Sequence, residues 1–201
     1  MPDAPSFAAF FRDYKDRFTR ALEGWDEAAL ARIVRVLAEV RDRGGTLLIA
    51  GNGGSAAIAN HTECDASKGT FHDARPPLVS RSLSANPSVL TAIGNDIGFA
   101  SIFERQVDYY ARPGDALLLV SSSGNSPNVI AACEAARKRG LVTIALVGFT
   151  GGGLKEAADH VLYVPCHNYG IVEDMHQASI HVITQYLKEA WAHHPGAGGG
   201  G

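Results

Sequence analysis

The 201-residue sequence predicts an α/β protein: a three-layer, doubly wound sandwich of about five parallel strands, with N-terminal helices and a long C-terminal helix. Two observations carry this prediction. Several short segments are apolar almost throughout, as strands covered on both faces are, and helical stretches alternate with them. The segments are TLLIA (46–50), the weaker LVSRSL (78–83), ALLLVS (116–121), LVTIALV (141–147) and HVLYVP (160–165).

Two helices come before any strand. Residues 7–21 are expected to form the first, with Ser6 as its N-cap. Residues 26–43 are expected to form the second, because Asp26 can cap it, apolar residues recur at helical spacing, and a glycine pair follows it. These helices serve either as a cover for the sheet or as an oligomer surface.

Further helical stretches connect the strands and end the domain. Asn86 is a good N-cap, and Pro87 suits the first helical position behind it. We expect one domain over residues 1–192 and a flexible tail over 193–201, because the tail's glycine-rich sequence cannot pack. The expected helices are 56–66, 87–93, 100–111, 127–139, 154–158 and about 173–191.

Charge and composition argue against several classes of partner. The net charge is -3 and the pI is near 6.2, so we expect no nucleic-acid surface. No apolar run approaches the roughly 18 residues of a membrane span, and we expect no membrane partner. The N-terminus lacks the pattern of a secretory signal. Three cysteines without a CxxC pair fit a reducing compartment, so we expect a cytoplasmic protein.

Two glycine and serine turns follow predicted strands and open helices: GNGGS (51–55) and SSSGNS (121–126). Open α/β sheets bind ligands at the carboxyl ends of their strands. There the free N–H groups of a helix N-terminus and the serine hydroxyls can hold a phosphate. Ala56 breaks the GxGxxG fingerprint and no Walker A lysine follows, so we expect no nucleotide cofactor. A phosphomonoester on a small polyol fits better.

Four stretches together resemble one known family. They are GNGGSAAIANHTECD (51–65), GNDIGF (94–99), SSSGNSPNV (121–129) and EDMHQASIH (173–181). In their order and spacing they are similar to the SIS (sugar isomerase) family, and most closely to its phosphoheptose isomerase group. The resemblance implies the SIS fold and a cytoplasmic homotetramer with active sites between subunits. It also implies isomerisation of sedoheptulose 7-phosphate to D-glycero-D-manno-heptose 7-phosphate.

The resemblance also implies roles for particular residues. Asp65 matches the catalytic base and His181 the catalytic acid of an enediol mechanism. His61, Asp65, Glu173 and His181 match the metal positions, and two imidazoles with two carboxylates suit Zn²⁺ best. Residues matching the sugar-phosphate contacts are Asn52, Gly53, Gly54, Ser55, Asn95, Asp96, Ser121, Ser122, Ser123, Ser126 and Glu173.

Spacing limits how these metal positions can meet. His61 and Asp65, four residues apart, share one helix face. Glu173 and His181 are eight residues apart, which is about 12 Å of helix rise. They can share an ion only through extended side chains or from different subunits. We expect His176, between them, to be structural, and Cys64 to be packed.

Two positions depart from the family pattern. Asp65 stands where the family has glutamate, and Glu173 stands where it has glutamine. The shorter side chain draws a base back by over ~1 Å, which can slow such a step about 10²-fold. Glu63 faces another side of its helix and is a poor substitute. Two alternatives therefore stay open: an isomerase of a different sugar phosphate, and a non-catalytic phosphosugar-binding or regulatory SIS protein.

Overall fold

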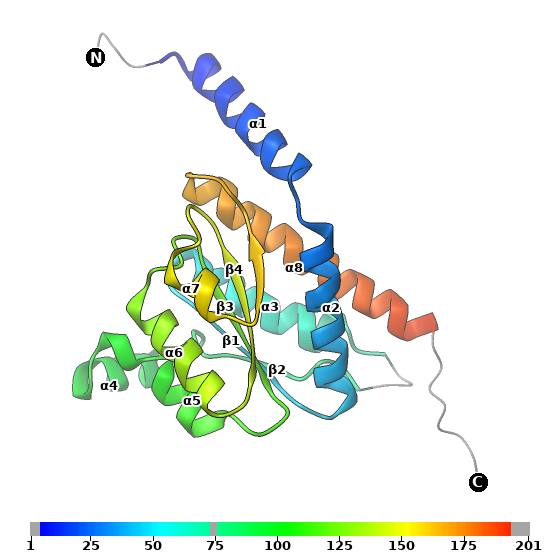
Figure 1. Cartoon of the computed structure of the whole chain (residues 1–201), viewed down its shortest axis with the longest axis vertical. Coiled ribbons are helices and arrows are strands. Elements are labelled where there is room, and N and C mark those ends of the chain that lie inside the picture. The colour runs from blue at the N-terminus through cyan, green and yellow to red at the C-terminus, as the bar shows by residue number, and fades with distance from the viewer. Residues whose placement is uncertain (1–4, 73–75, 194–201) are drawn as a thin grey trace.

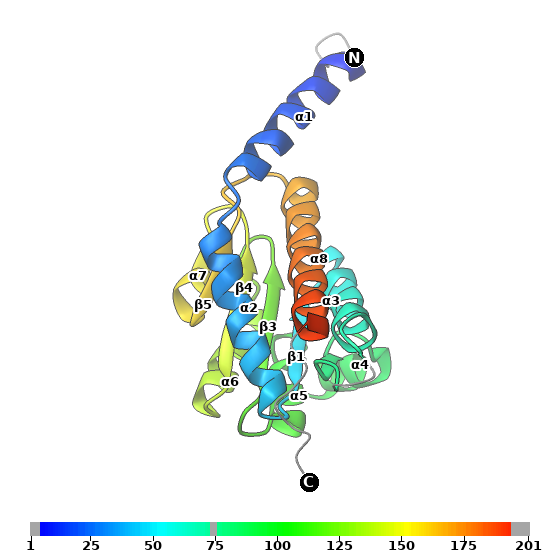
Figure 2. The same ribbon diagram turned by 90° about the vertical axis from the view of Figure 1, so that its right-hand side faces the viewer.

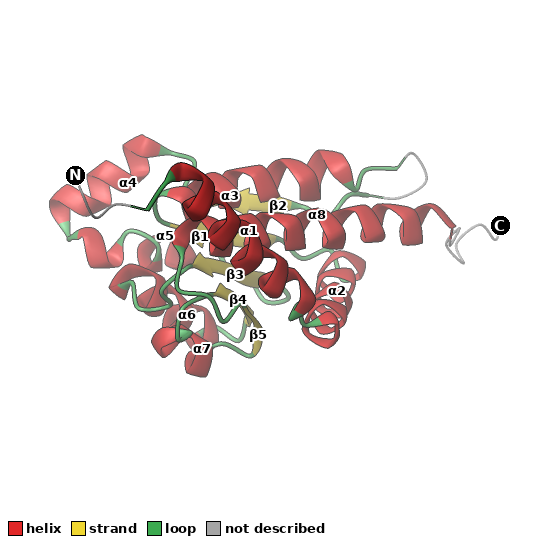
Figure 3. Cartoon of the chain, turned by 90° about the horizontal axis from the view of Figure 1, so that it is seen from above, coloured by secondary structure: helices red, strands yellow, loops and turns green. Residues whose placement is uncertain are grey.

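The computed structural model describes residues 5–72 and 76–193, and it confirms the predicted fold class. Five parallel strands form one sheet in the order β2-β1-β3-β4-β5, which can be followed from top to bottom in Figure 3. All five predicted strands are present, although the weakest is only three residues long. Their bounds are β1 Leu47–Gly51, β2 Ser80–Ser82, β3 Ala116–Ser121, β4 Val142–Val147 and β5 His160–Tyr163.

Helices cover both faces of the sheet, as the continuous apolar strands require (Figures 2 and 3). Alternate strand residues point to opposite faces, so Ile49 packs with α2, α3 and α8 while Leu48 packs with α4, α5 and α6. Two hydrophobic clusters result, one on each face. The bounds are α2 Glu27–Asp42, α3 Gly54–Cys64, α4 Pro87–Asp96, α5 Glu104–Tyr110, α6 Pro127–Lys138, α7 Gly152–Ala157 and α8 Tyr169–His193.

The first helix, α1 (Phe7–Glu23), projects from the rest of the chain (Figures 1 and 2). Ser6 caps it as predicted, accepting a hydrogen bond from the Ala9 N–H at 3.3 Å. No residue of α1 is buried, and its inner side reaches only a small cluster at the start of α8. Phe7 is 80% exposed, and Phe10 and Phe11 are each more than half exposed. Aromatic residues in water along one helix indicate a surface that lacks its cover.

Several element boundaries differ from the prediction. The last helix begins at Tyr169, four residues early, and the helix behind Pro87 runs on to Asp96. The stretch 100–111 divides into a 3₁₀ turn, η2 (Phe99–Ser101), and α5. The helix predicted over 56–66 ends as an α-helix at Cys64, and a π-helical turn, η1 (Asp65–Gly69), follows it directly. Most of the predicted tail, residues 194–201, lies outside the described residues. In the part described, no helix is both long and apolar enough to cross a membrane.

Candidate active site

The two predicted turns lie side by side because their strands are neighbours in the sheet. Gly51, at the end of β1, pairs with Val120 of β3. Two side-chain amides then tie the turns together: Asn52 donates to Asn128 at 2.8 Å, and Asn128 donates back at 2.9 Å. Asn128 is 1% exposed. Sequence reasoning missed its role, although the second asparagine of SSSGNSPNV was the available signal.

A cavity of about 150 Å³ opens between the turns, and we call it the serine pocket. Most of its lining was predicted from the sequence. Ser121 and Ser122 are buried beside it, and among the described residues the Ser122 hydroxyl has no hydrogen-bond partner. A buried hydroxyl without a partner is costly, so it points to a ligand. The lining residues are Asn52, Ser55, Val120, Ser121, Ser122, Ser123, Ser126, Tyr169 and Glu173.

Backbone geometry fixes the two turns beside this pocket. Gly124 has φ +66°, and a Cβ there would overlap the main-chain oxygen of Gly151. Only glycine fits that position without strain. Gly53 precedes the N-terminus of α3, and Gly54 is its first residue. The free N–H groups of that helix end therefore face the same region as the serine hydroxyls.

Glu173 belongs to the serine pocket. It lies on the second turn of α8, and a Cβ placed on Gly54 would overlap its carboxylate. The carboxylate therefore lies against the N-terminal end of α3, where the helix dipole favours a negative charge. Glycine at 54 allows this close approach. Glu173 was predicted to bind substrate, and the structure places it in this pocket.

A second group of side chains, the histidine group, consists of His61, Asp65 and His181. The Nε2 atoms of the two histidines are 3.1 Å apart. The Oδ2 atom of Asp65 is 3.2 Å from His61 Nε2 and 3.7 Å from His181 Nε2. One ligand atom from each residue lies within 4.8 Å of the others. Two imidazole nitrogens and one carboxylate oxygen converging in this way form a set that suits Zn²⁺.

The structure brings three of the four predicted metal positions together. Glu173 is not part of the group, because eight residues of α8 separate it from His181. Asp65 occupies the first position of the π-helical turn η1, and Glu63 points elsewhere, accepting a hydrogen bond from the Ser82 N–H at 2.8 Å. Single π-helical turns are often found at functional sites.

Two helices connect the serine pocket with the histidine group. Helix α3 begins at the pocket with Gly54 and Ser55, and it presents His61 near its end. Helix α8 carries Glu173 at the pocket and His181 two turns later. The two helices pack against each other (Figure 2). An anion-binding pocket and a group of acid–base side chains therefore share one pair of helices.

Some predicted residues lie apart from both places. Asn95 and Asp96 are exposed at the end of α4, where the Asn95 amide donates to Asp96 at 2.8 Å. They line neither the serine pocket nor the cavity beside the histidine group. Cys64 is exposed, so the expectation that it is packed was wrong for this chain. It lies at the end of α3, where the helix surface remains open.

His176 agrees with its predicted structural role. It is fully buried on α8, and within the described part of the chain neither ring nitrogen has a hydrogen bond of ordinary geometry. Burial lowers the pKa of His176 to about 4, and the backbone of Val147 offsets this only in part. The ring is therefore neutral at ordinary pH, as a structural residue in the core would be.

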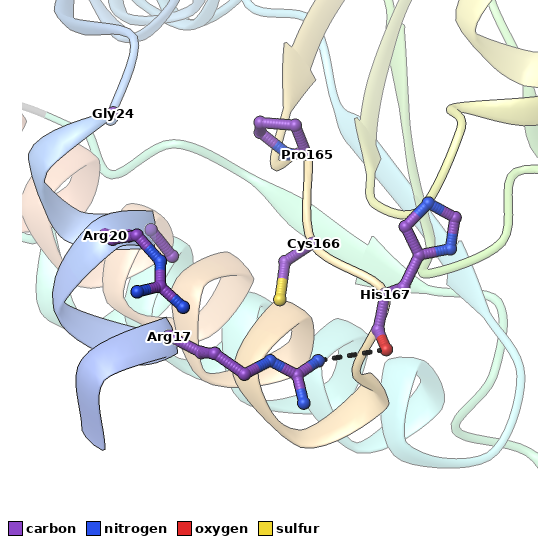
Figure 4. A pocket seen from close by; sticks show the side chains of 7 residues that line it. Arg17, Arg20, Gly24, Pro165, Cys166 and His167 are labelled. Atoms are coloured by element: carbon purple, nitrogen blue, oxygen red, sulfur yellow. Dashed lines mark hydrogen bonds between the residues drawn. The ribbon is translucent and has the colours of Figure 1, made fainter. Parts of the chain in front are cut away.

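Another cavity, of about 380 Å³, lies away from both groups, between α1 and the segment after β5. Figure 4 shows Arg17 of α1 reaching across it to the main-chain oxygen of His167, which accepts a hydrogen bond at 3.2 Å. Arg17 also lies 3.8 Å from Asp13. Its charge is therefore already engaged, and one wall of the cavity is the projecting helix.

Comparisons with known proteins agree with this geometry. The SIS domain family matches residues 9–148, and the chain belongs to that family. Phosphoheptose isomerase of Trichlorobacter lovleyi is 43% identical over 81% of this chain and 82% of its own length. The same enzyme of Rhodospirillum rubrum is 40% identical over 90% and 95%. The resemblance predicted from the four motifs is thus confirmed.

Solved structures give the same result. Phosphoheptose isomerase from Neisseria gonorrhoeae superposes with a TM-score of 0.82 at 32% identity, covering 90% of this chain and 96% of that one. The enzyme from Francisella tularensis superposes with a TM-score of 0.83 at 29% identity, with the same coverage. These relatives confirm the fold and support the prediction that the chain is an aldose–ketose isomerase.

Proposed function

We propose that this chain isomerises sedoheptulose 7-phosphate to D-glycero-D-manno-heptose 7-phosphate through an enediol. One observation carries the proposal: a serine pocket with an unpartnered buried hydroxyl shares two helices with a convergent His–Asp–His group. The pocket suits the phosphate, and the histidine group suits the carbonyl end of the sugar. Relatives named phosphoheptose isomerase supply the choice of substrate.

The serine pocket anchors the phosphate without a fixed positive side chain. Its donors are hydroxyls and the N–H groups at the start of α3, which suit an anion at a helix N-terminus. The Ser122 hydroxyl has no hydrogen-bond partner in the described part of the chain, so it can donate to the phosphate. The sugar is then fixed by one end, so its reactive carbons are presented in a repeatable position.

Proton transfer needs a base and an acid near the two reacting carbons. Asp65 acts as the base that removes the carbon proton, and His181 acts as the acid that moves the hydroxyl proton. Their reactive atoms are 3.7 Å apart, so both can serve one pair of adjacent carbons. His61, 3.2 Å from Asp65, holds that carboxylate in place.

The donor set of the histidine group fits a divalent metal, and Zn²⁺ is the ion that we propose. His61, Asp65 and His181 would hold it, and the proton-transfer roles of these residues describe the site without the metal, since His181 Nε2 cannot bind the ion and carry a proton at the same time. When bound, it would polarise the sugar carbonyl and stabilise negative charge on the enediolate oxygens. Glu173 lies in the serine pocket and not among these ligands.

We propose that the working form is a homotetramer with active sites at subunit interfaces. The exposed Phe7, Phe10 and Phe11 of α1 support burial by other chains. Ile97 and Phe99, next to the predicted site residues Asn95 and Asp96, are also half exposed or more. In a tetramer, this exposed surface of one chain would lie at an active site shared with a neighbouring chain. Light scattering on the purified protein tests the tetramer.

The three free thiols favour the cytoplasm as the compartment of this protein.

One observation favours an alternative substrate, a sugar phosphate other than sedoheptulose 7-phosphate. The carboxylate of Glu173 lies in the pocket that holds the phosphate, where the family pattern has a neutral amide. This charge would change how tightly, and in which orientation, the phosphate is held. The chemistry of the histidine group would stay the same.

The deciding experiment is an isomerase assay on the purified chain with sedoheptulose 7-phosphate, followed by chromatography of the sugar products. We expect an aldose heptose phosphate, and its formation should be lost in His181→Ala. Five- and six-carbon ketose phosphates are assayed in parallel. Faster turnover of one of them would replace the proposed substrate. Tight sugar-phosphate binding without turnover, with any divalent metal added, would indicate a non-catalytic binding protein.

A further inference from the structure

One ring atom in the histidine group has too many partners. The Nε2 atom of His181 is 3.0 Å from the amide nitrogen of Gln177 and 3.1 Å from His61 Nε2, and Asp65 lies 3.7 Å away. An imidazole Nε2 has either one proton or one lone pair. It can therefore serve only one of these neighbours well. A cation placed between them could be bound by all of these groups at the same time.

Gln177 is placed to complete the set around such a cation. It lies on α8 one turn before His181, so the two side chains share a helix face. The amide group presents nitrogen on one side and oxygen on the other, and half a turn about its last bond exchanges them. The contact to His181 therefore also places an oxygen donor within reach of the same point.

The residue that matches the family's glutamine is turned away from this point. Glu173 lies two turns before His181, and its carboxylate packs against Gly54 in the serine pocket. This chain has a glutamine four residues later, Gln177, and its amide lies at the histidine group.

The open space beside the histidine group agrees with this placement. A cavity of about 290 Å³ is lined on α8 by His181 and by residues that follow it, including Gln185 and Lys188. Gln177 lies on the other side of His181 along the helix. Gln177 can therefore bind a metal ion from the direction of the serine pocket. The opposite side of the ion, toward the cavity, then stays open to a ligand, as catalytic metal sites require.

We propose that the amide oxygen of Gln177 is the fourth protein ligand of a divalent metal held by His61, Asp65 and His181. This inference rests on the metal part of the proposed function. It replaces Glu173 in the predicted ligand set. The set then carries one negative charge, from Asp65, so a bound divalent ion keeps a net positive charge toward an incoming sugar oxygen.

The test is calorimetric titration of the metal-free protein with Zn²⁺, without substrate, and with Co²⁺ followed by its visible absorption. Gln177→Leu should weaken Zn²⁺ binding at least tenfold and lower the cobalt coordination number. Gln177→Glu should retain binding. Two matched variants, Gln185→Leu one turn after His181 and Glu173→Gln, should stay within twofold of the wild type.

The outcomes separate this inference from the proposed function. Unchanged affinity in Gln177→Leu, or a tenfold loss in Glu173→Gln, would overturn it. Absence of Zn²⁺ binding by the wild type would also overturn it, and isomerase activity in a chelator would show that the proposed function still stands. Should Gln177→Leu fail to fold by circular dichroism, Gln177→Asn replaces it. Asparagine keeps the amide but withdraws it, so tenfold weaker binding is again expected.

Discussion

The serine pocket and the histidine group are built in different ways. The pocket lies at the ends of two paired strands, with Ser121 and Ser122 no more than 5% exposed. The histidine group consists of side chains on helix surfaces, and His61 and His181 are close to half exposed. Backbone geometry therefore fixes the anchor, while helix packing positions the reactive groups. Substitutions in the pocket should change stability and affinity, and those in the histidine group should change rate.

The largest expected effect is in the histidine group. Asp65→Asn keeps the shape of the side chain but removes its basicity, so kcat should fall about 10³-fold, within the range for loss of a general base. Substrate affinity, measured by calorimetry, should change less than threefold. Glu63→Gln is the matched control, because Glu63 lies on the same helix and bonds the Ser82 N–H. Equal losses of rate in both variants would contradict the role of Asp65.

Stability should respond most strongly in the serine pocket. Gly124→Ala forces a Cβ onto the main-chain oxygen of Gly151 at φ +66°, and we expect the free energy of unfolding to fall by about 3 kcal/mol. Urea denaturation measures it. Gly153→Ala is the control, because a Cβ there meets only Ile130 at an ordinary 3.5 Å. That variant should stay within about 0.5 kcal/mol of the wild type. A tolerated Gly124→Ala would show that the turn is not rigid.

The same contrast explains what the sequence could predict. Strands buried on both faces, and the turns that follow them, depend on local pattern, so the fold and most of the pocket were predicted. Asn128 was missed because its partner Asn52 is 76 residues away in the chain. Pairing across that separation follows from the strand order, which no local pattern contains.

The local spacing within the histidine group could be predicted, but its three-dimensional arrangement could not, for a related reason. The spacing of His61 and Asp65 indicates a shared helix face, but their meeting with His181 depends on how α3 packs on α8. Gln177, the proposed fourth ligand, was not considered because the family pattern directed attention to position 173. Which residue of a helix reaches a given point depends on its rotation, and the π-helical turn at Asp65 changes the local register in a way that α-helical spacing does not describe.

Helix α8, one of the two helices that join the two regions, should be sensitive to acid. The folded-state pKa of His176, about 4, lies below its ordinary 6.5, so the unfolded chain binds the proton more tightly. The stabilisation is complete above about pH 6.5 and is lost as pH falls toward 4. We expect a loss of about 2 kcal/mol between about pH 7.5 and pH 5, measured by urea denaturation.

Two variants isolate that effect. His176→Leu removes the buried titrating group, so much of the pH dependence should disappear. The exposed His167→Leu should leave it unchanged. If both variants keep the full slope, carboxylates elsewhere determine the acid sensitivity and His176 does not.

A smaller effect concerns the negative charge in the anchor. Glu173 lies against the start of α3, where its negative charge repels a phosphate held at the same helix end. Glu173→Gln should tighten binding of the sugar phosphate about fivefold, equivalent to about 1 kcal/mol, and less so at high salt. Calorimetry measures it. Asp174→Asn removes the same charge from an exposed neighbouring position and should have less than a twofold effect. Weaker binding in Glu173→Gln would mean that the carboxylate contacts the sugar.

The smallest effect separates binding from stability within the pocket itself. Ser122 is 4% exposed, and its hydroxyl has no partner among the described residues, so Ser122→Ala should leave the ligand-free protein as stable or up to about 1 kcal/mol more stable. Sugar-phosphate binding should weaken about threefold, because one hydrogen bond to the phosphate is lost. Ser121→Ala is the contrasting variant, since Ser121 Oγ accepts from the Gly124 N–H at 3.2 Å and its loss should destabilise the turn. If Ser122→Ala lowers stability and leaves binding unchanged, that hydroxyl has a structural partner and is not part of the anchor.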